Sequence, residues 1–154
     1  MKSLAKLFTV AVVALTPAAL SAQDVGKSVA ARQAAMKLYS FYLGQLGAMA
    51  KGEADYDAAV ATNAAASLNA LANLDGSKMW PPGSDNATLG EATRALPAIW
   101  ATYPAVVEKS KAFKTAAAAM ADAAGGGLEA LQGAIGPVGK SCGGCHEDFR
   151  QPKE

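Results

Sequence analysis

The chain has 154 residues, 51% of them hydrophobic, and a formal net charge of +1. This length suits a single domain. With 14 basic and 13 acidic residues, the chain lacks the positive excess of a nucleic-acid-binding protein, and it contains no polybasic tract for a membrane surface.

The N-terminal stretch has the pattern of a secretory signal peptide. Lys2 and Lys6 precede a short apolar run over residues 7–15, and small residues follow at positions 20–22. The apolar run is too short to span a membrane, and no other run approaches that length. We predict a signal peptide over residues 1–22, a mature domain over residues 23–154, and export to the periplasm.

Helix-breaking residues divide the mature chain into four segments, and no segment alternates apolar and polar residues as a strand does. The predicted helices cover about residues 24–51, 55–75, 98–124 and 128–150. Asp24 is the expected N-cap of the first helix and Gly52 its stop. A late start or kink is expected at Pro104, and a kink at Pro137. With short connections, these helices predict an all-α, antiparallel up-down four-helix bundle.

Apolar residues recur at steps of three and four along each segment, which is the pattern of a bundle seam. The fourth segment places Leu128, Leu131, Ile135, Val138, Cys142, Cys145 and Phe149 inward. The third places Ile99, Tyr103, Val106, Ser110, Phe113, Ala117 and Met120 there. The first contributes Val29, Arg32, Met36, Tyr39, Leu43, Leu46 and Ala50, and the second Tyr56, Val60, Ala64, Leu68 and Leu71.

Both cysteines of the chain lie in the segment Cys142-Gly143-Gly144-Cys145-His146. On a helix, the two thiols and the imidazole project from one face. Cys-x-x-Cys-His is the attachment signature of a c-type haem, with the histidine as an axial ligand of the iron. A closed zinc site needs four ligands, a redox dithiol belongs in a βαβ context, and a disulfide over so short a loop constrains little. The segment therefore predicts one covalent haem c.

A second axial ligand can come only from upstream, because no histidine or methionine follows His146. The methionines of the mature chain are Met36, Met49, Met79 and Met120, and each is more often core filling than a ligand. Met36 lies one turn beyond Arg32 on the same predicted face. Arg32 either extends its guanidinium to water or binds a haem propionate, and the haem motif favours the propionate.

The last helix, in which Cys142 to His146 is followed by Arg150, resembles the last helix of the class II cytochromes c, the cytochrome c′ family. The resemblance to this family covers essentially the whole mature chain. Arg32-Gln33-x-x-Met36 resembles the haem-contact segment of that family's first helix. The loop around Ser84-Asp85 resembles its loop motif, in which Gly-Thr-Glu is common. The resemblance implies that Arg32, Gln33, Ser84, Asp85 and Arg150 contact the haem. It also implies a four-helix bundle, a periplasmic location and frequent homodimers.

Two functions remain open for such a protein. The first is one-electron transfer by a haem iron ligated by His146, with Met36 as a sixth ligand. The second is binding of nitric oxide or carbon monoxide at a five-coordinate iron, with Met36 covering the distal side. An enzymatic function is not expected, because the chain has no paired acid and base and no nucleophile constellation. The redox partner protein is not identified by the sequence.

Overall fold

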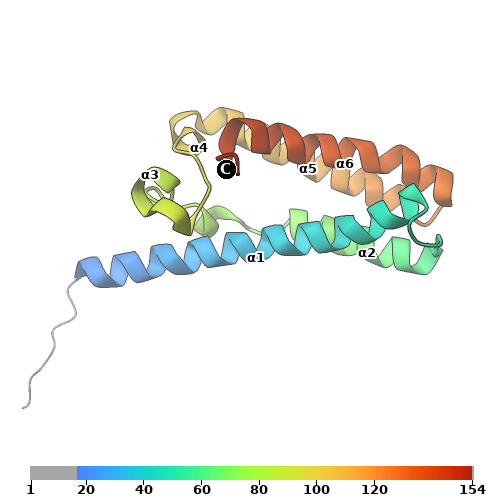
Figure 1. The fold of residues 1–154 in the computed structure, drawn as a ribbon, viewed down its shortest axis with the longest axis horizontal. Coiled ribbons are helices and arrows are strands. Elements are labelled where there is room, and N and C mark those ends of the chain that lie inside the picture. Colours follow the sequence, from blue (N-terminus) through green and yellow to red (C-terminus); the bar gives the residue numbers. More distant parts are fainter. Residues whose placement is uncertain (1–16, 154) are drawn as a thin grey trace, which may run out of the picture.

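The computed structural model describes residues 17–153 and is built almost entirely of helices (Figure 1). The four long helices are α1 (Pro17–Lys51), α2 (Ala58–Ala72), α5 (Tyr103–Ala123) and α6 (Leu128–Phe149). The connection from α2 to α5 contains two short α-helices, α3 (Asn86–Leu89) and α4 (Ala98–Ala101). It also contains two 3₁₀ turns, η1 (Ser77–Met79) and η2 (Gly90–Ala92).

The four long helices pack in a closed ring. Helix α1 contacts α2 and α6, and α5 contacts the same two helices from the opposite side. Figure 1 shows the α1–α2 and α5–α6 turns at one end of the bundle, and the α2–α5 connection beside the C-terminus at the other. The predicted antiparallel four-helix bundle is confirmed. The expectation of short connections is wrong for α2–α5, because residues 73–102 join these two neighbouring helices.

The start of α1 differs from the predicted start. The helix begins at Pro17, so Asp24 lies inside it rather than at its N-cap. Most of the predicted signal peptide, residues 1–16, lies outside the described residues, and the predicted cleavage after Ala22 falls within α1. The signal peptide therefore stays a prediction. No helix between residues 17 and 153 combines the length and apolarity that crossing a bilayer requires.

The other helix ends follow from local chemistry. Asp57 caps α2, because its carboxylate accepts hydrogen bonds from the N–H groups of Ala59 and Val60. Gly52 has a φ of 76°, the left-handed conformation that ends many helices, as its predicted role requires. Helix α6 continues unbroken through Pro137.

The bundle core lies along the predicted seams, with five corrections. Its fully buried large side chains are Leu46, Leu68, Met120, Leu131 and Val138. The residues predicted to face inward that are exposed instead are Met36, Val60, Tyr103, Ser110 and Leu128. Tyr103 begins α5 after a break at Thr102, so it does not share the face of Ile99 in α4. In the alanine-rich α2, Ala61 occupies the inward position expected for Val60.

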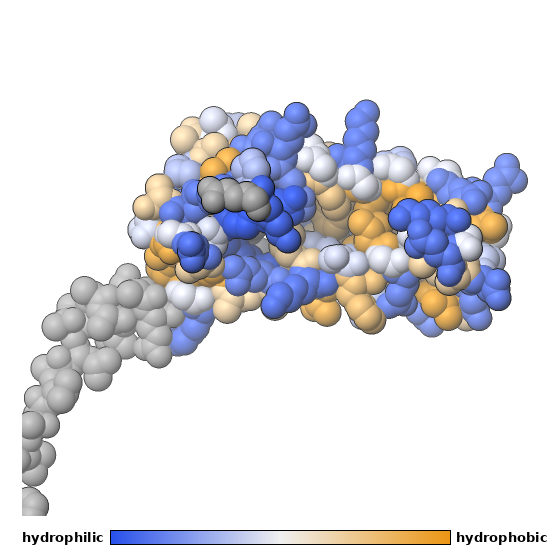
Figure 2. Space-filling view, viewed as in Figure 1, coloured by the Kyte–Doolittle hydropathy of each residue, from blue (hydrophilic) through white to orange (hydrophobic). Residues whose placement is uncertain are grey.

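The α1–α6 seam is the part of the bundle that bears on the site. On the face shown in Figure 2, apolar side chains gather between these two helices. Helix α6 carries the cysteine motif near its C-terminal end, and that end lies beside the α2–α5 connection (Figure 1). The helices and the connection together therefore surround the motif.

Candidate functional site

The thiols of Cys142 and Cys145 are free and half-buried in the last turns of α6. Burial raises the pKa of both thiols, and Lys109 opposes the rise at Cys145. His146 follows on the same helix and is also half-buried. Across residues 17–153, no three side chains of the His, Cys, Asp or Glu type gather as a metal site. Among the described residues, the two thiols and the imidazole of the motif are therefore not part of a metal-binding cluster.

Cys145 packs into an aromatic cluster at the end of the bundle. The buried members of this cluster are Ala95, Ile99 and Phe149, and Trp80 and Trp100 pack against them together with Cys145. The indole N–H of Trp100 donates to the backbone oxygen of Trp80 at 3.1 Å, which ties the Trp100 ring to the Trp80 backbone. The cluster holds both tryptophans of the chain, and their rarity is a sequence signal that could have pointed to this contact.

Cys142 lies on the side of α6 that faces α1. The charge of its thiolate raises the pKa of Tyr39 in α1, although burial of the phenol is the larger cause. Tyr39 is fixed from two directions: its hydroxyl donates to the Leu71 oxygen at 3.0 Å, and its ring meets Phe113 edge to face at 5.0 Å. Tyr39 is therefore held in place by α2 and α5 within range of the Cys142 charge.

Lys109 of α5 crosses α6 beside the motif. Its Nζ lies 2.8 Å from the Asp148 carboxylate, and this ion pair raises the pKa of Lys109. The same Nζ lies 3.6 Å from the point that a β-carbon at Gly144 would occupy. A β-carbon there would make only van der Waals contact with the lysine, so the ion pair and not the glycine holds Lys109 beside the motif.

Arg32 is only 3% exposed and binds the α2–α5 connection. Its Nη1 donates to Met79 O at 3.3 Å and to Ser84 Oγ at 2.6 Å. Its Nη2 donates to Ser84 O and to Thr93 Oγ1, the latter at 2.8 Å. The guanidinium carbon lies 4.7 Å from the centre of the Trp80 ring, a cation–π distance. Each terminal nitrogen thus has two protein acceptors, and a propionate contact requires Nε–H or an exchange of one of these bonds.

The other predicted contact residues of the connection are brought to the same place. Ser84 is fully buried under Arg32. The Asp85 carboxylate caps α3 by accepting from Thr88, and although burial raises the pKa of Asp85, these hydrogen bonds hold it below its usual value. Gln33 donates from Nε2 to the Ala92 oxygen at 2.9 Å. The structure therefore joins the predicted residues of α1 and the connection through direct hydrogen bonds.

Replacing Arg32 by methionine is expected to lower the free energy of unfolding by about 3 kcal/mol. The substitution removes four donors and leaves buried acceptors on Ser84 and Thr93 without partners. Urea unfolding of the haem-loaded protein, followed by far-UV circular dichroism, measures the loss. Lys37→Met is the matched control, because Lys37 is exposed on the same helix, and we expect less than about 0.5 kcal/mol for it.

Met36 is the one predicted site residue of α1 that takes no part in these hydrogen bonds. Its side chain is 42% exposed on α1, whereas Met49 and Met120 are buried in the core. Met36 is therefore not core filling, which was the alternative to a role at the haem. It stands one turn after Arg32 and one turn before Tyr39, the neighbour of Cys142.

The charges of two arginines act on His146. Burial lowers the pKa of the imidazole, and the positive charges of Arg150 and Arg94 lower it further. Arg150 is the C-cap of α6, and its N–H donates to the His146 oxygen at 3.1 Å. Arg94 was not predicted as a site residue. It lies in the irregular connection, where hydrophobic periodicity gives no signal.

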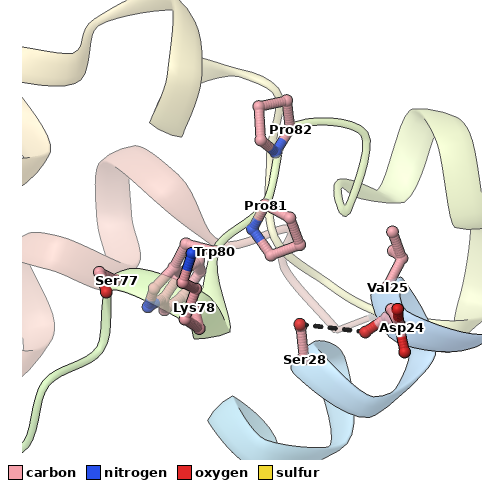
Figure 3. A pocket seen from close by; sticks show the side chains of 8 residues that line it. All are labelled: Asp24, Val25, Ser28, Ser77, Lys78, Trp80, Pro81 and Pro82. Carbon is pink, nitrogen blue, oxygen red and sulfur yellow. Dashed lines mark hydrogen bonds between the residues drawn. The ribbon is translucent and has the colours of Figure 1, made fainter. Parts of the chain in front are cut away.

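A separate pocket of 580 Å³ lies between residues 24–28 of α1 and the chain from η1 to Pro82. Figure 3 shows Trp80 and Pro81 on one side of it, and Val25 and Ser28 of α1 on the other. No thiol, histidine or methionine lines this pocket. It touches the cysteine site only through Trp80.

Comparison with known proteins agrees with the geometry. The family model described as cytochrome c′ matches residues 27–150. The chain belongs to the cytochrome c′ family. Cytochrome c-554 of Cereibacter sphaeroides is 41% identical over 145 residues, which are 93% of each chain. The solved cytochrome c′ of Rhodobacter sphaeroides superposes with a TM-score of 0.81 at 39% identity, covering 84% of this chain and 98% of that one.

A further solved relative is the nitric oxide complex of a mutant cytochrome c′ from Alcaligenes xylosoxidans. It is 31% identical, with a TM-score of 0.74, and covers 84% of this chain and 97% of the other. Proteins of the cytochrome c′ family carry covalently bound haem c, and the predicted cofactor is confirmed. The donor set fits this group, because two free thiols and an imidazole share one face of α6.

Proposed function

We propose that this cytochrome c′-family protein is a one-electron carrier. In this proposal Cys142 and Cys145 form thioethers to one haem, and His146 ligates its iron. The observation that supports it is the pair of free, half-buried thiols next to the only histidine of the chain. When bound, the haem supplies an iron that alternates between the ferric and ferrous states.

The residues around the motif hold this site in place. Trp80 and Trp100 pack against Cys145, and Tyr39 lies within range of the Cys142 charge, so both thioether positions are partly shielded from water. Arg32 fixes the connection that carries Ser84 and Asp85, and Gln33 adds a second tie at Ala92. We propose that these residues and Arg150 contact the haem edge, as the resemblance implies. Burial and nearby charge then set the reduction potential.

Gas binding is the second candidate, supported by the nitric oxide complex of the Alcaligenes relative. It requires a distal side on which Met36 is a cover and not a ligand. Electronic and resonance Raman spectra of both oxidation states separate the two functions. Low-spin His/Met spectra in both states contradict gas binding. A five-coordinate, high-spin ferrous iron that takes up carbon monoxide contradicts a purely electron-carrying site.

A redox titration tests electron transfer directly. We expect one reversible one-electron step and one haem per chain, measured by the pyridine haemochrome method and by titration with mediators. A mature protein without haem, or one whose haem cannot be cycled reversibly, contradicts the proposal.

Export and assembly complete the proposal. Haem attachment after export to the periplasm fits the predicted signal peptide over residues 1–22. A homodimer through the first two helices fits the exposed Leu38 and Phe41 on α1 and Val60 on α2. We propose no enzymatic activity for the chain.

A further inference from the structure

The segment that follows the axial histidine is tied to the connection before α4. Ala95 and Arg150 form an isolated antiparallel β-bridge. The Leu96 N–H donates to the Phe149 oxygen at 3.0 Å, and the Gln151 N–H donates to the Arg94 oxygen at 2.8 Å. Helix α6 therefore ends in a backbone clamp made by residues 94–96 and 149–151.

The Arg94 side chain closes this clamp. Its Nε donates to the Gln151 oxygen at 2.8 Å, and its Nη2 donates to the same oxygen. The side-chain oxygen of Gln151 accepts from Asn86 Nδ2 at 2.8 Å. Gln151 is thus held through its N–H, its carbonyl and its side chain, five residues after His146. The guanidinium of Arg94 is therefore fixed against the chain that directly follows the His146 turn of α6.

We propose that Arg94 is a positioning residue of the haem site, which locks the end of α6 behind His146 and supplies positive charge on the histidine side of the haem. This inference rests on the proposed ligation by His146.

Two separable effects follow from this role. The last turn of a helix frays unless its terminal groups are bound, and fraying at residues 149–151 loosens the imidazole that the helix carries. A positive charge near the iron disfavours the ferric state, because that state carries one more positive charge. Arg94 therefore keeps the histidine fixed through hydrogen bonds and raises the reduction potential through charge.

Two substitutions separate these effects in the haem-loaded protein. Arg94→Ala removes both the hydrogen bonds and the charge. Arg94→Lys keeps the charge but loses the fork that binds one oxygen with two nitrogens. Lys153→Ala is the matched control, because it removes a charge from the tail that Arg94 binds, and Lys153 makes no ion pair among the described residues.

Hydrogen exchange of the Leu96 and Gln151 amides and the reduction potential are the two readouts. We expect both amides to exchange about tenfold faster or more in both Arg94 variants. We expect a lower potential in Arg94→Ala alone, and no change in Lys153→Ala. Unchanged exchange in Arg94→Ala, or equal potential shifts in Arg94→Ala and Lys153→Ala, overturns the inference. Haem content is measured first. If the unsubstituted protein carries no haem, the proposed function fails. Amide exchange still tests the clamp in that case, so the two failures are distinguishable.

Discussion

Replacing both Cys142 and Cys145 by serine is expected to reduce covalent haem attachment to background. Serine keeps the size of the side chain but cannot form a thioether to the haem. The two thiols are the only cysteines of the chain, so no other residue can take over the link. Haem-stained denaturing gels and intact-protein mass spectrometry of the exported chain measure the loss.

The single substitutions make this test sharper. Each single serine variant keeps one thiol, and we expect each to retain part of the covalent haem. Ser141→Ala is the matched control, because Ser141 precedes the motif without being part of it, and its hydroxyl donates to the Val138 oxygen of the same helix at 2.8 Å. Full haem staining in the double variant, or none in Ser141→Ala, contradicts thioether attachment at the two cysteines.

Haem loss also bears on the stability of the bundle. Leu131 and Val138 are fully buried on the seam of α6, and Cys142 continues that seam toward Tyr39. The cysteines therefore occupy positions where a bundle normally places apolar residues. We expect the double serine variant to accumulate less than the unsubstituted protein, because two hydroxyl groups then stand on this seam without the haem.

The helices could be predicted from the sequence because their signal is local and repeated. Steps of three and four residues mark α6 from Leu131 to Phe149, and the structure places these residues inward or half-buried. The same reasoning failed at Tyr103. The predicted apolar pattern continued through Thr102 as if in one helix, whereas the structure has two helices, α4 and α5, that meet there. It also failed at Val60, since apolar contrast is weak in an alanine-rich helix.

The polar contacts of the site could be predicted only in part. Arg32 was found because a charged residue on an apolar seam demands a partner. Its actual partners, Ser84 and Thr93, lie 52 and 61 residues away in irregular chain. Arg94 left no signal at all, because its role depends on the tertiary contact with Gln151. Long-range hydrogen bonds between irregular segments have no sequence period.

Arg32 combines the two kinds of information. The sequence made it a partner for a haem carboxylate, and the structure makes it the anchor of the α2–α5 connection. These roles are compatible, because a guanidinium carries a fifth N–H on Nε. An arginine that fixes the connection also fixes Trp80, which lies under it and packs in the cluster of Cys145. The connection thereby belongs to the site.

Replacing Met36 by alanine is expected to speed carbon monoxide binding to the ferrous protein by about tenfold or more. Loss of either an iron ligand or a steric cover opens the distal side, and tenfold corresponds to about 1.4 kcal/mol of barrier. Stopped-flow mixing of the reduced protein with carbon monoxide measures the rate. The prediction therefore holds for both candidate functions and tests only whether Met36 faces the iron.

Leu38→Ala is the matched control, because Leu38 is exposed to nearly the same degree, 43% against 42%, and lies two residues further along α1. Two residues along a helix turn the side chain to a different face, so Leu38→Ala should bind carbon monoxide at the unsubstituted rate. If both variants bind carbon monoxide at the rate of the unsubstituted protein, Met36 does not face the iron. If Met36→Ala alone is faster, its ferrous spectrum decides the role: a change from low spin to high spin identifies a lost ligand, and an unchanged high-spin spectrum identifies a lost cover.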